Sequence, residues 1–101
     1  MIVRISRGSF EPSSAQVIAE RLRRSADTLI PAVRRLDGLL AYHAGIDSAA
    51  GTMVNVSTWR DLDAARQMDG LAEMQALAKE FLALGVQFER PIINYETLWS
   101  I

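Results

Sequence analysis

Strand and helix signals alternate along this 101-residue chain in the order β-α-β-β-α-β, which predicts an α+β domain with a four-stranded antiparallel sheet. Short β-like apolar runs occur at residues 2–7, 39–46, 52–59 and 92–99. Apolar residues at helical spacing fill the two long segments that separate the first run from the second and the third from the last. The second and third runs are joined by a short turn, so the order is the split βαβ of ferredoxin-like folds, in one domain over residues 1–101.

The first strand, over residues 2–7, ends at Gly8 and is followed by a helix. Ser13 and Gln16 have the spacing of a capping box, in which two side chains satisfy the free N–H groups of a helix start. The helix continues with apolar residues one turn apart, namely Ile18, Leu22, Ala26 and Leu29.

Pro31 interrupts this pattern because proline has no N–H to donate inside a helix. We therefore expect the first helix to end or kink near residues 27–30, with a short helical piece from 31 to 36 closed by Asp37 and Gly38. The second strand follows over residues 39–46. A turn at residues 47–51 then pairs it antiparallel with the third.

The second half begins with Asp61 at a predicted N-cap, where its carboxylate can accept hydrogen bonds from the first helical turn. The helix that follows should break or bend at Gly70, in the middle of the apolar pattern, and stop at Gly85. After a loop that contains Pro91, residues 92–99 form the last strand.

The third strand has an unusual face. Side chains alternate along a strand, so Val54, Val56 and Thr58 share one side and look like core. The other side carries Met53, Asn55, Ser57 and Trp59. A row of amide, hydroxyl and indole N–H groups is costly to bury unless something polar binds there. This row is the best functional lead in the sequence.

Composition excludes several classes of function. The chain has no cysteine and a single histidine, so thiolate chemistry is absent and no motif for a metal site is present. The net charge of −1 gives no basic excess for nucleic acid. No apolar run resembles a membrane span or a secretion signal, so we expect a cytoplasmic protein that contacts neither membrane nor nucleic acid.

Both faces of the predicted sheet are substantially apolar. The helices of this fold cover only one face, and the uncovered face would expose a large apolar patch. Two copies that pack sheet to sheet around a two-fold axis would bury it, so we expect a homodimer.

The stretch Asn55-x-x-x-Trp59-x-Asp61-x-x-Ala64-Ala65, together with the fold and length, resembles the antibiotic biosynthesis monooxygenase superfamily, whose members are small dimeric α+β barrels. The resemblance implies a ligand pocket between sheet and helices. It also implies that Asn55 and Trp59 match the asparagine–tryptophan pair that serves the cofactor-independent oxygenases of polyaromatic phenols. Val54, Val56 and Thr58 would then face the partner sheet.

The implied chemistry is cofactor-independent oxygenation of a small aromatic or quinol-like compound, with no metal or flavin. Deprotonation gives a phenolate that can pass an electron to O₂, while the N–H groups of Asn55 and Trp59 donate to its oxygen. His43 is the candidate base. Lys79 or Arg66 could steady the anion, and Arg4 and Ser6 would join the pocket rim if they face the helices. The expected substrate-binding residues are Ser57, Met53, Met68 and Met74.

Two other functions stay open at this point. The same cavity would suit a non-catalytic or stress-response ligand-binding dimer, or an isomerase or lactone-processing enzyme of the same architecture. Degradation of haem by this superfamily requires a histidine on the helix after the third strand. Here Asp69 stands at about that place, which argues against haem chemistry.

Overall fold

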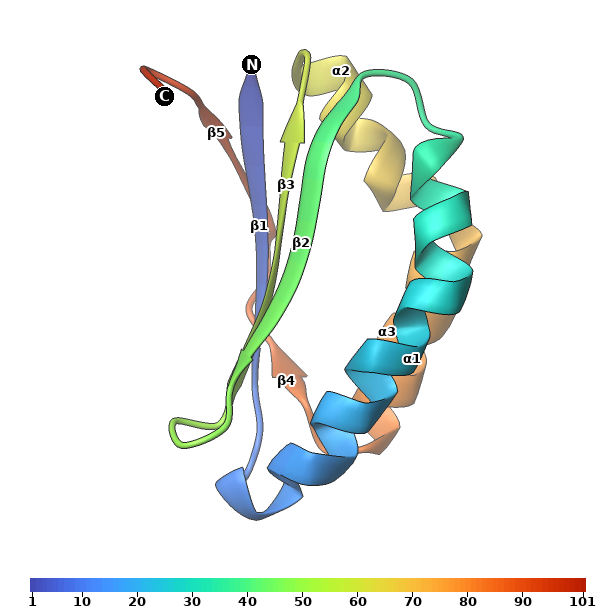
Figure 1. The fold of residues 1–101 in the computed structure, drawn as a ribbon, viewed down its shortest axis with the longest axis vertical. Helices are drawn as coiled ribbons and strands as arrows, with labels where there is room; N and C mark the ends of the chain where they lie inside the picture. Colours follow the sequence, from blue (N-terminus) through green and yellow to red (C-terminus); the bar gives the residue numbers. More distant parts are fainter.

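A computed structural model describes all residues from 1 to 101 as two layers, an antiparallel sheet and a layer of helices on one of its faces (Figure 1). The strands are β1 (Ile2–Ser9), β2 (Leu39–Asp47), β3 (Thr52–Trp59), β4 (Gln87–Phe88) and β5 (Ile93–Glu96). The helices are α1 (Ala15–Arg34), α2 (Leu62–Arg66) and α3 (Ala72–Ala83), with 3₁₀ turns η1 (Pro12–Ser14) and η2 (Gln67–Gly70).

The sheet confirms the predicted α+β class and adds one strand. Its order is β2-β3-β1-β4, and β5 also pairs with β1, which makes five strands. The last strand was expected over residues 92–99 but covers only Ile93–Glu96, while β4 pairs with the other end of β1. Pro91 lies between the two short strands and cannot donate to a ladder, which accounts for the division.

The predicted pairing of β2 with β3 is confirmed, with one irregularity. Leu39 pairs with Trp59, but the next pair joins Ala41 to Thr58, so Leu40 is an extra residue in β2. A bulge of this kind changes which side chains point to each face beyond it.

The start and end of α1 both differ from expectation. Pro12 opens a 3₁₀ turn, the helix proper begins at Ala15, and Ser14 at its N-cap makes no side-chain bond, so the capping box expected at Ser13 and Gln16 is wrong. The helix also runs through Pro31 to Arg34 without ending. Pro31 has no N–H, so the backbone carbonyl of Asp27, one turn earlier, has no helical hydrogen-bond partner. Both residues are exposed, so water can donate to that carbonyl.

The second helical region follows the prediction. Asp61 Oδ1 accepts from the backbone N–H of Ala64 at 2.8 Å and caps α2. The region is then divided by η2, which ends at Gly70, and α3 stops before Gly85, whose φ of +94° suits glycine.

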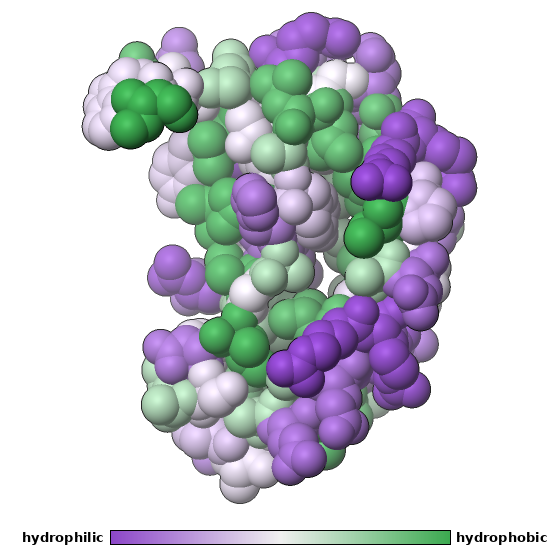
Figure 2. Space-filling model, in the orientation of Figure 1, coloured by the Kyte–Doolittle hydropathy of each residue, from purple (hydrophilic) through white to green (hydrophobic).

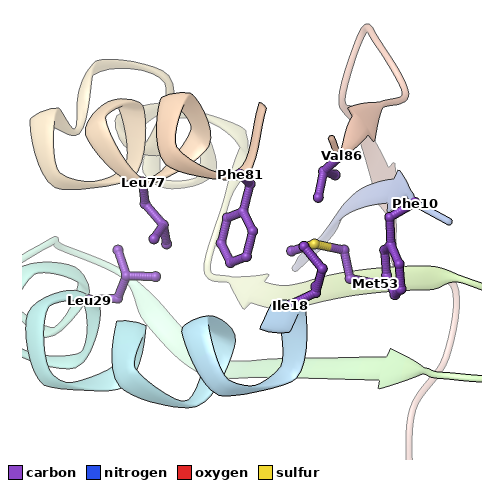
Figure 3. Packing of buried hydrophobic residues seen from close by; sticks show 7 residues of the cluster. All are labelled: Phe10, Ile18, Leu29, Met53, Leu77, Phe81 and Val86. Carbon is purple, nitrogen blue, oxygen red and sulfur yellow. The ribbon is translucent and has the colours of Figure 1, made fainter. Parts of the chain in front are cut away.

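Two clusters of buried apolar side chains fill the space between the layers. In the first, Leu29 of α1 and Leu77 of α3 point toward each other, and Met53 reaches in from β3 (Figure 3). This cluster consists of Phe10, Ile18, Leu29, Met53, Leu77, Phe81 and Val86. The second cluster surrounds the fully buried Trp59 and consists of Ala32, Val33, Trp59, Ala64, Ala65, Met68 and Leu71.

The other face of the sheet is covered by nothing (Figure 1). We call it the outer face; it carries Val3 and Ile5 from β1, Val54 and Val56 from β3, and Ile93 and Tyr95 from β5. Ile93 and Tyr95 are 44% and 51% exposed, and the tail beyond β5 exposes Leu98, Trp99 and Ile101. No helix is long and apolar enough to cross a membrane.

Candidate ligand-binding site

A row of polar side chains crosses the helix-facing side of the sheet, between the two apolar clusters. Ser57 at the centre of β3 pairs with Arg4 on β1 and with Tyr42 on β2. Arg4 pairs in turn with Asn94 on β5, and the next position along the sheet adds Asn55. Cross-strand neighbours on one face are close enough for their side chains to interact. The strand register therefore gathers these groups at one place.

Two neighbouring hollows that share lining residues lie beside this row. The inner cavity, of about 60 Å³, lies between sheet and helices, and Arg4, Ser6, Tyr42 and Asn55 are among its lining residues. A larger groove of about 450 Å³ runs between α1 and β2, and 10 of its 12 lining residues are hydrophobic. Figure 2 shows a hollow between the strand layer and the helix layer. Five residues line both the inner cavity and the larger groove, namely Leu22, Ser25, Leu29, Tyr42 and Ala44.

Tyr42 lines both the groove and the inner cavity. Its hydroxyl is buried and has no hydrogen-bond partner. Burial raises the pKa of Tyr42 to about 12, although the positive charge of Arg4 acts in the opposite direction. The side chain is therefore neutral at neutral pH, with an O–H free to donate to an oxygen of a ligand.

Arg4 places a positive charge at the base of the cavity. The residue is 5% exposed, and its guanidinium donates to Asn94 Oδ1 at 3.3 Å and to Asp69 Oδ1 at 2.7 Å. A buried charge is costly unless it is paired. A guanidinium has five N–H groups, so these two bonds leave donors for another acceptor.

Four of the residues proposed from sequence line the inner cavity, namely Met53, Asn55, Met68 and Met74. Arg4 and Ser6 also line it, because β1 does turn this side toward the helices. Ser57 and Trp59 share their face but do not line the cavity. The Trp59 indole N–H donates to Ser57 Oγ at 2.8 Å, and both residues are buried, so the structure does not present that N–H to a ligand.

The charged and titratable candidates are placed differently from expectation. His43 pairs with Val56 on the outer face, so within the chain it points away from Asn55 and lines neither hollow. Lys79 and Arg66 are exposed and also lie outside the lining. The cations at the cavity are instead Arg4 and Arg90. No carboxylate or imidazole lines either of the two hollows, and no group of three or more His, Asp or Glu side chains is placed to hold a metal ion.

The fold is that of the antibiotic biosynthesis monooxygenases, which confirms at the level of fold the resemblance seen in the sequence. A candidate antibiotic biosynthesis monooxygenase from Deinococcus radiodurans is 22% identical, with a TM-score of 0.75 over 100% of this chain and 96% of that one. SnoaB, a cofactor-independent oxygenase from Streptomyces nogalater, is 16% identical, with a TM-score of 0.66 over 99% of this chain and 95% of that one.

A protein of unknown function from Nitrosomonas europaea, NE2512, shares the fold equally well, at 17% identity and a TM-score of 0.70 over 99% of this chain and 91% of that one. No protein-family profile and no curated protein matches the sequence. At these identities the likeness establishes the fold, and the activity must be argued from the site itself.

Proposed function

We propose that the protein is a cofactor-independent monooxygenase that acts on a small aromatic or quinol-like compound. The unpartnered hydroxyl of Tyr42, a residue that lines both the apolar groove and the inner cavity with Arg4 and Asn55, carries this proposal. A buried O–H without a partner costs free energy, and a ligand oxygen at that point would recover it. The activity of SnoaB, which has the same fold, supports the reaction type.

The two volumes determine how such a ligand would lie. Pockets for small molecules usually measure about 300–1,000 Å³. The groove, at about 450 Å³, is in this range, whereas the inner cavity of about 60 Å³ is well below it. The body of the ligand therefore lies in the groove between α1 and β2, and only an oxygen-bearing edge reaches Tyr42, Asn55 and Arg4.

The chemistry draws its electrons from the substrate. Loss of a proton from a phenol or anthrone gives an anion that passes one electron to O₂, and the resulting radical and superoxide combine to form a C–O bond as a peroxide. For an anthrone, loss of the second C–H proton and cleavage of the O–O bond then give a ketone and water, so that CH₂ and O₂ become C=O and H₂O. The protein contributes orientation, exclusion of water and donors to the anion.

Asn55 and Tyr42 are the donors that we assign to this step. Each hydrogen bond to a charged oxygen contributes about 1.5–3 kcal/mol. Trp59 supports the site from behind, because its indole holds Ser57 in the polar row. His43 lies on the outer face of the sheet and cannot reach the cavity to act as a base. In this proposal the substrate must therefore be acidic enough to form the anion by itself.

The protein acts as a homodimer in this proposal. The outer face carries valine and isoleucine from β1 and β3 and has no covering element. A second copy placed against it would also cover the exposed apolar tail beyond β5. A closed barrel of two sheets would hold each groove rigid from behind.

Consumption of O₂ tests the oxygenase proposal. We expect hydroquinones and anthrones to stimulate O₂ uptake above the buffer rate. Uptake should fall more than tenfold in Asn55→Ala and about tenfold in Tyr42→Phe, since about 1.4 kcal/mol is tenfold in rate. Thr28→Ala, at an exposed position on α1, is the control and should match the wild type. Wild-type uptake equal to buffer, or equal rates in all variants, would disprove the proposal.

A second candidate, a ligand-binding protein without catalysis, is favoured by one observation. The residues that line the cavity include no carboxylate or imidazole that could take a proton from a weakly acidic ligand. If aromatic compounds bind with the same dependence on Tyr42 and Asn55 but no O₂ is consumed, this second function replaces the first.

A further inference from the structure

The two side chains of the Arg4–Asp69 ion pair differ strongly in their exposure to solvent, and this difference points to ligand recognition. The side chain of Arg4 is 6% exposed, whereas that of Asp69 is 64% exposed. Returning Asp69 to water would cost little, because exposed carboxylates gain only a small free energy from such pairs. Arg4 cannot return to water without leaving the sheet. The buried guanidinium of Arg4 therefore requires a negatively charged partner, whereas Asp69 does not require Arg4. An anionic group of a ligand could take over the role of Asp69.

The position of Asp69 makes replacement easy. It lies in η2, the 3₁₀ turn between α2 and α3, and is followed by the exposed Gly70. Its backbone carbonyl accepts from Gln75 Nε2 at 2.9 Å, and this bond does not involve the carboxylate, so it need not break when the carboxylate leaves Arg4. The other partner of Arg4, Asn94, is neutral and would stay in place.

The inner cavity, which Asp69 does not line, offers the space for a charged group of the ligand beside Arg4. At about 60 Å³ it holds roughly the share of two water molecules, which matches a single polar group of a ligand. That group would meet the guanidinium of Arg4 and the free hydroxyl of Tyr42 together. A planar guanidinium binds an ionised oxygen more strongly than a neutral one.

We propose that Arg4 anchors an ionised oxygen of the ligand in the inner cavity and that Asp69, which pairs with Arg4 from outside the cavity lining, competes with the ligand for this guanidinium. The ligand class is thereby an aromatic or otherwise apolar body with one acidic group, either a phenolate or a carboxylate. This inference rests on the groove and cavity of the proposed function and adds a specificity-determining residue and its internal competitor. It does not require the oxygenase reaction to occur.

Equilibrium binding of two matched probes tests the charge preference. 2-Naphthoate and 2-naphthamide have nearly the same shape and differ in charge, and titration calorimetry measures both. We expect the wild type to bind the carboxylate at least tenfold more tightly than the amide. Arg4→Gln should remove this preference, with amide affinity changed less than threefold. Arg24→Gln, which removes an exposed arginine of α1 from outside the lining, should keep it.

The competitor makes a second, opposite prediction. Asp69→Asn keeps a hydrogen-bond acceptor but removes the charge, so it should tighten binding of 2-naphthoate several-fold and leave that of 2-naphthamide unchanged. Because Asp69 is exposed, this variant tests the inference even if Arg4→Gln does not fold. With 4-nitrophenol at fixed pH, the wild type should raise the visible absorbance of the phenolate, which distinguishes acceptance of phenolates from acceptance of carboxylates alone.

Three results would overturn the inference: equal affinities of the wild type for the two naphthalenes, binding of neither, or a 2-naphthoate affinity in Asp69→Asn that is unchanged or weaker. The outcome is separable from that of the oxygenase test. Charge-selective binding without O₂ uptake would disprove the oxygenase proposal alone. Uptake of O₂ without charge-selective binding would disprove this inference alone.

Discussion

On its helix side β1 presents Arg4 and Ser6, whereas on its outer side the same strand presents Val3 and Ile5. β3 repeats the contrast with Asn55 and Ser57 inside and valines outside. A sheet with one covered face normally turns apolar side chains toward the helices and polar ones toward water. Here a band of polar side chains interrupts the apolar clusters of the covered face, and the uncovered face carries valine and isoleucine, which is the arrangement expected if a ligand binds on the first and a second copy of the chain on the second, as we propose. The following predictions test each side of this comparison.

The largest effect is expected for the structural anchor of the inner face. Trp59 is fully buried, so Trp59→Ala should lower the free energy of unfolding by about 3–5 kcal/mol, as measured by urea denaturation. Leu82→Ala, at a position 56% exposed on α3, should change it by no more than about 0.5 kcal/mol. Equal losses in the two variants would show that the second apolar cluster does not support the fold as described.

Substitutions on the outer face should weaken dimerisation and leave the folding of each chain unchanged. Val56 lies in its centre, beside Ile5 and His43 on the neighbouring strands. Val56→Glu would bury a charge in the proposed dimer, and we expect the dimer dissociation constant to rise more than tenfold, which is about 1.4 kcal/mol. Light scattering measures the change, and the far-ultraviolet circular dichroism should stay the same.

The matched control for that experiment is Thr28→Glu, which adds the same charge to the exposed side of α1. It should leave the dimer intact. A wild-type protein that is monomeric at micromolar concentration would refute the proposed dimer itself, whatever the variants do.

The smallest effect is expected at the unpartnered hydroxyl. Tyr42→Phe removes a buried group that has no hydrogen bond, so the free protein should gain about 1 kcal/mol of stability while ligand binding weakens. The exposed Tyr95→Phe should be neutral. A loss of stability in Tyr42→Phe would mean that the hydroxyl has a partner in the folded protein.

Tyr42 also gives a pH signature. Its pKa is about 12 in the folded chain and near 10 when unfolded, so only the unfolded chain loses this proton as the pH rises between the two values. Ionisation then favours unfolding, and stability falls as pH rises through this window. In Tyr42→Phe that alkaline loss should be absent, which urea denaturation at pH 9 and 11 would measure.

Much of the fold was predictable because its signals are local. The alternation along β3, the N-cap at Asp61 and the break at Gly70 each depend on residues close in sequence, and each is confirmed. Alternation grouped Met53 with Asn55 but took the opposite face, with Val54 and Val56, for core, and that face is the uncovered one. It was the resemblance to the monooxygenases that implied a cavity on the Met53 side, which Met53 and Asn55 do line. The continuation of α1 through Pro31 to Arg34 was missed, where an end or a kink was expected, because the sequence does not show that Asp27 and Pro31 lie on the exposed side of the helix.

The chemistry of β2 was not predictable, and the cause is the extra residue at Leu40. Strict alternation from Leu39, whose partner Trp59 faces the helices, would turn His43 inward. The bulge shifts the alternation by one, so Tyr42 faces the cavity and His43 faces out. Likewise, Arg4 and Asp69 are 65 residues apart and meet only through the packing of η2 on the sheet.

The bulge also has a consequence for how such a site can change. Because β2 is an edge strand, the gain or loss of one residue there leaves β3, β1 and both apolar clusters in place. If β2 slipped so that Leu40 paired with Thr58 and the bulge disappeared, strict alternation would turn His43 toward the cavity and Tyr42 away from it. A one-residue slip of this edge strand can therefore exchange a phenol donor for an imidazole base, a larger change of chemistry than most single substitutions make.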